Sequence, residues 1–531
     1  MRKTVVALGV SVLAICLWAQ EKPERIDLEV AHRIRSEAFG ANSKVMDTAF
    51  YLSDVYGPRL TGSPGFKAAA DWATGKMKQW GIARIKLEPW GPFGQSWICT
   101  HFAAEMKEPE FMPLVGFAQP WSAGTGGPVT AEAVMAVVNS TEDMDKLKGQ
   151  LRGKIVLMAA PHASELAVNP MAHRLSDAEL AAAATAPDPE SGNPSGLPLG
   201  FPQRPPYVAE RGRGENARGF RAQRNKFFKE EGALVVLSPG SGPDGGTVMG
   251  GPAGSQDPDE VLPPPSVVLT NEHYNRIARL IEHKIPVKLT FDIQARVTDP
   301  GDVLNVVAEI PGARPETGLV MLGGHLDSWT AGTGATDNGA GAAVAMEAMR
   351  ILKTLDLKMA RTVRVALWSG EEQGMLGSKA YVREHFADPS DMEPKADYGK
   401  LSGYFNLDNG GGKIRGVYLQ DNDMMRPILE AWLAPFRDLG ATTLTIRATG
   451  STDHVSFDAV GLPAFQFIQD PLEYATRSHH SNMDVYDRLQ AGDLEQASAI
   501  MAWVVYNAAT RPAMLPRKPM PAPETGRGSG N

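Results

Sequence analysis

The sequence predicts an α/β protein with a doubly wound, mostly parallel sheet and a second, β-rich module inserted into it. After Asp299, short apolar runs typical of buried strands alternate with helical segments, which is the pattern of an open parallel sheet covered by helices. From about residue 116 to residue 294 the pattern changes to short β-type runs separated by glycine and proline, which indicates a separate unit. The length of 531 residues is also too great for one ordinary core.

The N-terminus has the features of a secretory signal. A basic pair precedes an apolar run from Val5 to Trp18, and the small Ala19 follows. This run is too short to span a bilayer, so we expect residues 1–19 to be a cleaved signal peptide. The mature protein is then exported to the periplasm or the extracellular space and has no stable membrane span.

Composition narrows the possible partners and the sources of stability. Signal cleavage removes Cys16 and leaves Cys99, so no intramolecular disulfide is expected. Lipidation at Cys16 is the weaker alternative, because Ile15 is not the small residue that normally precedes a lipidated cysteine. The formal net charge of -8 argues against nucleic acid as a partner.

The first half of the mature chain divides into two segments. Residues 20–120 begin the main domain and are expected to be helical from 26 to 80, apart from a glycine- and proline-rich loop at 57–65. Residues 121–297 are assigned to the inserted module, with strand signals at 133–138, 154–158, 233–237 and 266–269. Its interior, 160–224, is rich in alanine, proline and charge, and we expect an exposed excursion there.

The second half completes the main domain over residues 298–510. Strands are expected at 305–310, 320–324, 362–368, 403–407, 417–420 and 464–468, with helices at 338–355, 374–386, 424–438 and 492–509. The tail, 511–531, is rich in proline, glycine and basic residues, and is expected to be disordered.

Polar clusters follow four of the predicted strands. His325 and Asp327 end the first, and Asp337 then opens a helix, a position that favours negative charge. The other clusters contain Glu371-Glu372, Asp408 and His479-His480. Because the carboxyl ends of parallel strands meet at one edge, we expect these side chains to converge. Imidazoles and carboxylates in this ratio suit divalent ions, which favours two zinc ions per chain, with cobalt or manganese able to substitute.

The ordered motifs resemble those of metallopeptidase family 28, a family of co-catalytic zinc exopeptidases. The matching motifs are His325-x-Asp327, Thr336-Asp337-Asn-Gly-Ala-Gly341, Ser369-Gly-Glu371-Glu372, Asn406-Leu-Asp408 and His480-x-x-x-Asp484. Taken singly, Glu-Glu and His-His pairs are usually solvated surface residues, and glycine-rich turns usually serve backbone geometry. It is the ordered combination of the motifs that is specific. The inserted module resembles the protease-associated domain that some members of this family carry.

The resemblance implies a zinc exopeptidase fold and a division of ligands between two zinc ions. Asp337 would bridge the ions. His325 and Asp408 would complete one site, and Glu372 and His480 the other. A cis peptide bond after Asp337 is also expected, because relatives have one.

The resemblance also implies catalytic roles. Glu371 would be the general base, since the carboxylate next to a ligand must face the cleft to take a proton. Asp327 would orient His325 by bonding the second nitrogen of the His325 ring. His479 would either stabilise an oxyanion or pack. Arg477 would either pair with a substrate carboxylate or bond loop carbonyls.

Together these features predict a secreted dinuclear zinc exopeptidase that cleaves short peptides, either an aminopeptidase or a carboxypeptidase Q-like dipeptidase. Two alternatives stay open: a receptor-like binding protein that has lost its metals, and a single-zinc glutaminyl cyclase. The inserted module is expected to fold over the cleft mouth and to restrict access to short peptides. The sequence leaves open which substrate terminus is recognised, the side-chain specificity, and the oligomeric state, with a homodimer as one option.

Overall fold

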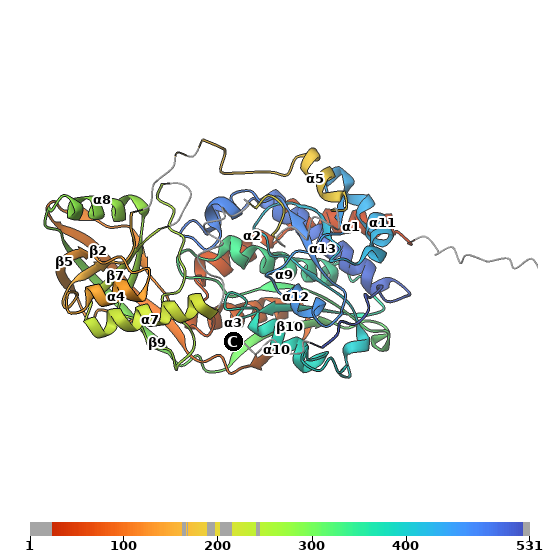
Figure 1. Ribbon diagram of the computed structural model, residues 1–531. Coiled ribbons are helices and arrows are strands. Elements are labelled where there is room, and N and C mark those ends of the chain that lie inside the picture. Colours follow the sequence, from red (N-terminus) through yellow and green to blue (C-terminus); the bar gives the residue numbers. More distant parts are fainter. Residues whose placement is uncertain are drawn as a thin grey trace, which may run out of the picture.

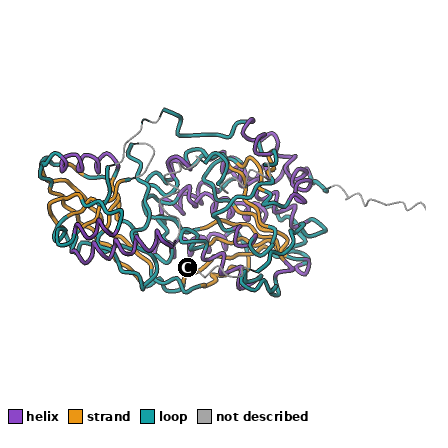
Figure 2. Tube along the Cα trace, viewed as in Figure 1, coloured by secondary structure: helices purple, strands orange, loops and turns teal. Residues whose placement is uncertain are grey.

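A computed structural model describes residues 24–161, 166, 168–187, 197–201, 215–240 and 245–523. The predicted signal peptide at 1–19 lies outside the described residues, as does the end of the predicted disordered tail. The strands form two separate sheets, in two lobes of the molecule (Figures 1 and 2). Within the described part of the chain, no helix is both long and apolar enough to cross a membrane.

The first sheet has eight strands in the order β1-β10-β12-β11-β13-β16-β14-β15. Its centre, β12-β11-β13-β16, is parallel, whereas β1, β10 and β14 join neighbours in antiparallel fashion. The strands are β1 (Ala83–Trp90), β10 (Val303–Ile310), β11 (Leu319–His325), β12 (Thr362–Trp368), β13 (Leu401–Asn406), β14 (Ile414–Tyr418), β15 (Thr443–Thr445) and β16 (Ala464–Gln469). The predicted strands are therefore present, and β1 and β15 were not predicted.

Helices cover both faces of this sheet, which confirms the doubly wound α/β fold. In β11, Val320 and Leu322 pack with helices on one face, while Leu319 and Met321 pack on the other. The first face carries α1 (Leu28–Ala38), α2 (Val45–Phe50), α3 (Pro64–Gln79), α9 (Ala340–Thr354), α11 (Arg426–Leu433) and α13 (Ala491–Thr510); the second carries α10 (Leu376–His385) and α12 (His454–Asp458). All seven residues of β11 are buried, as expected for a strand between two helical layers.

The second sheet lies in the chain between β1 and β10, and we call residues 91–302 the insertion. Its strand order is β3-β2-β9-β5-β6-β7-β8-β4. The elements are β2 (Ser96–Glu108), β3 (Met112–Pro113), β4 (Gly116–Ala118), β5 (Val129–Met135), β6 (Ile155–Leu157), β7 (Val235–Pro239), β8 (Ser266–Leu269), β9 (Lys288–Thr298), α4 (Thr141–Leu147), α7 (Glu215–Glu231) and α8 (Asn271–Glu282). This sheet begins at Ser96, ahead of the boundary predicted at 121, because β2 pairs along its length with β9.

Most described residues of the predicted exposed excursion are exposed, as expected, but a few apolar side chains anchor it to the first lobe. Residues 168–187 and 197–201, which we call the strap, leave the lobe of the insertion and cross to the first lobe (Figure 1). There α5 (Asp177–Ala184) lies beside β15. Leu175 and Leu180 are buried there against Tyr418 and Ile468. Burial of these apolar side chains holds an otherwise exposed segment against the first lobe.

The first part of the tail that was predicted to be disordered makes specific contacts with the first lobe. Leu515 is only 2% exposed and lies close to Gly403. Arg517 donates to the carbonyl oxygen of Tyr398 at 3.0 Å, and Lys518 forms an ion pair with Asp458. These contacts anchor a segment whose proline and glycine content suggested disorder.

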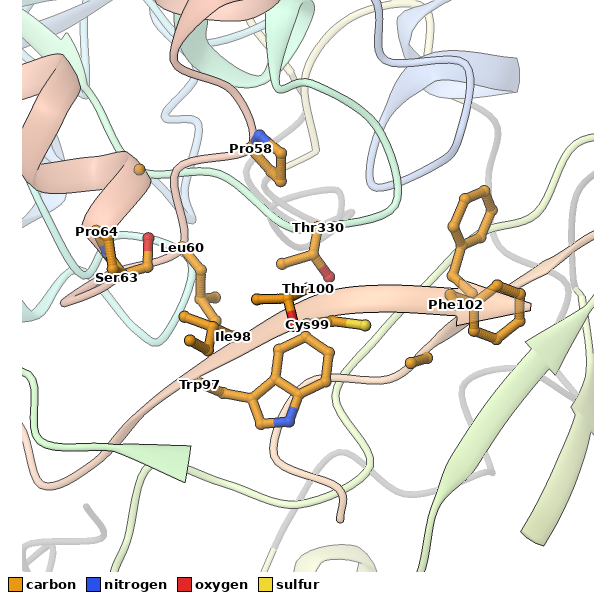
Figure 3. Close-up of a pocket in the computed structure, with 13 residues that line it drawn as sticks. Pro58, Leu60, Ser63, Pro64, Trp97, Ile98, Cys99, Thr100, Phe102 and Thr330 are labelled. Atoms are coloured by element: carbon orange, nitrogen blue, oxygen red, sulfur yellow. The ribbon is translucent and has the colours of Figure 1, made fainter. Parts of the chain in front are cut away.

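A cavity of about 420 Å³ lies at the junction of the two lobes (Figure 3). Loop residues Pro58 and Leu60 line one side, and Trp97 and Phe102 of β2 line the other. The Cys99 thiol is free and exposed among these residues. The insertion therefore meets the first lobe through an apolar but incompletely filled contact.

Candidate metal centre

The structure brings the four predicted clusters together at the carboxyl ends of the parallel strands. His325 is the last residue of β11, and Glu371 and Glu372 follow β12. Asp408 follows β13, and the loop after β16 carries His480. Neighbouring strands of the same direction end at the same edge, so side chains far apart in sequence become neighbours in space.

Asp337 lies between two groups of side chains. Its Oδ1 is 3.3 Å from His325 Nε2, which is also 3.3 Å from Asp408 Oδ1. Its Oδ2 is 3.1 Å from His480 Nε2, which is 3.0 Å from Glu372 Oε2. One carboxylate thus faces two separate sets of one histidine and one acid.

The chemistry of these groups fits divalent cations. Donor atoms of His325, Asp337 and Glu372 lie within 4.8 Å of one another, as do those of His325, Glu371 and Asp408. Asp337 Oδ2 and Glu372 Oε1 are buried and have no hydrogen bond of good geometry from the described residues. Buried carboxylate oxygens in this state are costly unless a cation compensates them, and mixed imidazole and carboxylate ligands suit zinc.

The electrostatics of the acids point in the same direction. Burial raises the pKa of the Glu371 carboxyl well above its ordinary value. Burial, followed by the charge of Asp337, raises the pKa of Glu372 to about 7. For His480, burial lowers the pKa, but Glu372 and Asp337 outweigh it and raise the pKa well above its usual range. The site therefore concentrates negative charge in a buried place, which favours bound cations.

Asp327 lies beside the second ring nitrogen of His325, and its predicted role in orienting that ring stays a prediction. His325 Nδ1 is 3.0 Å from the main-chain oxygen of Asp327 but 3.6 Å from its carboxylate. That carboxylate instead accepts from the Thr61 hydroxyl at 3.0 Å and from the main-chain N–H groups of Glu371 and Glu372 at 3.3 and 3.2 Å. Asp327 thus fixes the turn that carries the two glutamates.

Arg59 supports the site, although the glycine- and proline-rich loop at 57–65 gave no indication of such a role in the sequence. Its side chain is fully buried and donates to the main-chain oxygens of Leu326 at 2.6 Å, Thr333 at 2.9 Å and Gly334 at 2.7 Å. Burial lowers the pKa of this guanidinium to about 10. Since these carbonyls lie on the loop between β11 and Asp337, Arg59 holds that loop in place.

Asp484 and Asn338 fix the turn around the Asp337 carboxylate. Asp484 accepts from the main-chain N–H of Thr336 at 2.5 Å and from its hydroxyl at 2.8 Å. The Asn338 amide donates to the carbonyl of Leu407 at 2.8 Å. The peptide bond between Asp337 and Asn338 is cis, as predicted. Spacing alone could not reveal the partners of Asp484 and Asn338, because each contact joins loops more than sixty residues apart.

The two residues with open roles lie at the edge of the site. The His479 ring stacks on His480 with centroids 3.7 Å apart, and its Nε2 is 3.8 Å from Asp337 Oδ2. Arg477 Nη1 lies 3.3 Å from Glu473 Oε1. The contribution of His479 to an oxyanion site and that of Arg477 to carboxylate binding stay predictions.

The insertion contacts the loop that carries His480. The Gly250 N–H donates to the His480 carbonyl at 2.8 Å, and the Asn482 N–H donates to the Val248 carbonyl at 3.1 Å. His480 has a φ of 56°, a left-handed conformation that non-glycine residues rarely adopt. These hydrogen bonds from outside the loop help to hold that conformation.

Comparisons with known proteins agree with this site. The family model described as "Peptidase family M28" matches residues 305–505. Human carboxypeptidase Q is 25% identical over 90% of this chain and 88% of its own length. The structure of a peptidase M28 precursor from Shewanella amazonensis is 25% identical, with a TM-score of 0.65, and the match covers 93% of this chain and 98% of that one. A zinc aminopeptidase from Bacillus subtilis is 19% identical and shares the fold, with a TM-score of 0.53 over 88% of this chain and 95% of its own. Residues 305–505 therefore match the metallopeptidase family M28, and the similarity to carboxypeptidase Q and to the M28 precursor extends over most of the chain.

Proposed function

We propose that the protein is an exported exopeptidase that uses two zinc ions to hydrolyse a terminal peptide bond of short peptides. The position of Asp337 between two histidine and carboxylate sets carries this proposal. His325 and Asp408 would hold one ion, and Glu372 and His480 the other, with Asp337 shared. Bound zinc would polarise the scissile carbonyl and lower the pKa of the attacking water.

Glu371 is proposed as the general base. Its main-chain N–H and that of Glu372 are both tied to Asp327, so the two neighbouring side chains leave one fixed turn. Glu372 reaches His480 at 3.0 Å, whereas Glu371 Oε2 is 3.9 Å from the nearest histidine nitrogen, His325 Nε2. Glu371 can therefore take a proton from water and pass it to the leaving amine.

The restriction to short peptides is proposed to come from the insertion. Its residues 248–250 bond the loop of His480, and its strap packs beside the same loop at His173 and Leu472. Folded substrates would have to displace these contacts to reach the site. The similarity to carboxypeptidase Q and to zinc aminopeptidases leaves both substrate termini as candidates for recognition.

A panel of short peptides blocked at either terminus tests the activity. We expect free dipeptides to be hydrolysed by the zinc-loaded protein, one terminal block to abolish cleavage, and folded casein to resist internal cleavage. Cyclisation of an N-terminal glutamine with one zinc per chain would identify a glutaminyl cyclase instead. Zinc binding without hydrolysis of any peptide would favour a receptor-like protein.

The substitution Glu371→Gln tests the general base. The amide keeps the shape of the side chain but cannot accept a proton, so kcat should fall by about two to four orders of magnitude. Zinc content, measured by mass spectrometry of the metal, should stay unchanged. The exposed Glu393→Gln is the matched control. Near-normal turnover of Glu371→Gln would contradict the role.

A further inference from the structure

Among the described residues of the metal centre, the two histidines of the loop after β16 are the most exposed. The side chains of His479 and His480 are 28% and 34% exposed, whereas those of His325, Asp337 and Glu372 are 1%, 5% and 3% exposed. The side of the two stacked imidazoles is therefore the most open approach to the buried carboxylates. Side chains beside these rings become the walls that a substrate meets.

Aromatic rings flank this open side. The Phe201 ring of the strap lies 6.2 Å from the His479 ring and 5.8 Å from the Tyr474 ring, edge-on to both. Next to His480, the Trp329 ring lies at 6.1 Å, and Trp121 of the insertion packs against Trp329 at the same distance. The insertion thus supplies one aromatic wall directly and supports the other.

The backbone around Phe201 is held in place. The Leu199 N–H donates to the Tyr418 hydroxyl at 2.7 Å, and the Phe201 N–H to the Pro198 carbonyl at 3.2 Å. Gly200 has a φ of +80°, and a Cβ there would lie 2.6 Å from a ring carbon of Pro471. Only glycine fits this close approach in this conformation, so the strap is shaped to bring Phe201 down onto the loop after β16.

Ion pairs fasten the earlier part of the strap. Arg174 lies 2.9 Å from carboxylate oxygens of both Asp470 and Asp493, whose side chains are 1% and 6% exposed. Arg415 donates to the carbonyl of Leu175 at 2.9 Å and to Asp470 at 2.8 Å. Charge-assisted bonds to buried acids are among the stronger polar contacts in proteins. The strap is therefore a fixed part of the cleft.

We propose that Phe201 is a specificity-determining residue, whose ring favours peptides with an apolar side chain beside the scissile bond. The inference rests on the proposed exopeptidase function and adds a substrate class to it. Half-buried against His479 and Tyr474, the Phe201 ring presents apolar surface to the open side of the metal centre. An apolar substrate side chain loses water contact against this ring, whereas glycine gains nothing there.

The substitution Phe201→Ala tests whether the Phe201 ring sets the preference for apolar side chains, with peptides that differ only in those side chains. For substrates with leucine or phenylalanine at the preferred position, kcat/KM should fall about tenfold, while Gly-Gly and Ala-Ala should change by less than about twofold. Phe201→Leu should retain most of the preference because it keeps apolar volume. Val168→Ala is the control, since that side chain lies on the same strap and is 82% exposed. An equal loss on all substrates, or an unchanged preference, would overturn the proposal.

A binding measurement separates this inference from the proposed activity. The probes are Leu-Leu and Gly-Gly analogues in which CH2–NH replaces the amide, titrated calorimetrically into the zinc-loaded protein. Phe201→Ala should weaken the Leu-Leu analogue about tenfold and leave the Gly-Gly analogue unchanged. If these affinities are found in a protein that cleaves no peptide, the exopeptidase function is refuted, but the role of Phe201 in binding apolar side chains is supported. Equal affinity of Phe201→Ala and wild type for the Leu-Leu analogue would refute the wall even in an active enzyme.

Discussion

The two sheets have the same number of strands but differ in how they are covered. In β11 of the first sheet every residue is buried, whereas β9 of the second sheet alternates buried residues with half-buried or exposed ones. Helices exclude water from both faces of the first sheet, and its parallel strands gather their polar ends at one edge. The second sheet has no such edge of converging acids among its described residues. A cluster of buried charges thus needs both full coverage and parallel strand ends.

The largest expected effect comes from removing the carboxylate shared by both ligand sets. Asp337→Ala should lower the zinc content from about two ions per chain to nearly none, because each set loses a ligand at once. Activity on dipeptides should disappear with the metal. The exposed Glu393→Ala is the control for loss of a carboxylate. Two retained ions per chain would show that Asp337 is not a bridge.

A pair of matched core substitutions compares the two sheets directly. Leu322 in β11 and Leu289 in β9 are both fully buried. Leu322→Ala and Leu289→Ala should each lower the free energy of unfolding by about 2–5 kcal/mol, measured with guanidinium chloride. Only Leu322→Ala should also weaken zinc binding, since β11 ends in His325. Equal zinc affinity of the two variants would mean that the metal centre is insensitive to packing beneath it.

The smallest effect concerns an ion pair at the rim of the first sheet. His385 lies 2.7 Å from Glu88, and this hydrogen bond lowers the pKa of Glu88 to about 2, below its ordinary value of 4.5. Because the folded pKa is the lower one, the pair stabilises the fold above about pH 4.5, and this stabilisation is lost as the pH falls towards 2.

Glu88→Gln should remove that part of the pH dependence, by at most about 1 kcal/mol because solvent screens the pair. Thermal melts between pH 3 and pH 7 would measure it. Glu384→Gln changes an exposed acid of α10, the helix that carries His385, and should leave the pH dependence unchanged. If Tm changes with pH in the same way for wild type and Glu88→Gln, the ion pair makes no contribution to the pH dependence of stability.

The fold was predictable wherever burial left a plain pattern in the sequence. The mostly apolar runs of β11 and β12 are typical of strands covered on both faces, and the polar residues directly after them indicated the metal centre. Strands β2 and β9 were not predicted because their exposed positions carry charged and polar residues, which dilute the signal. Such half-exposed strands become recognisable only once their partner is known.

The supporting residues were missed for a different reason. Arg59 and Thr61 act on residues more than 250 positions away, so no local pattern indicates their role. The strap has a polar composition that suggests exposure, and only the distant Asp470 and Asp493 explain why Arg174 holds it down. Contacts of this kind depend on the assembled fold rather than on any single segment.

The hydrogen bond from Gly250 to His480 has a consequence for how such proteins can diverge. An inserted unit that only sat beside the first lobe could be exchanged or deleted without effect on the metal. Here, replacing the insertion with another would also remove the Gly250 donor and the Val248 acceptor, which help to hold His480 in its left-handed conformation. The insertion and the loop after β16 must therefore change together.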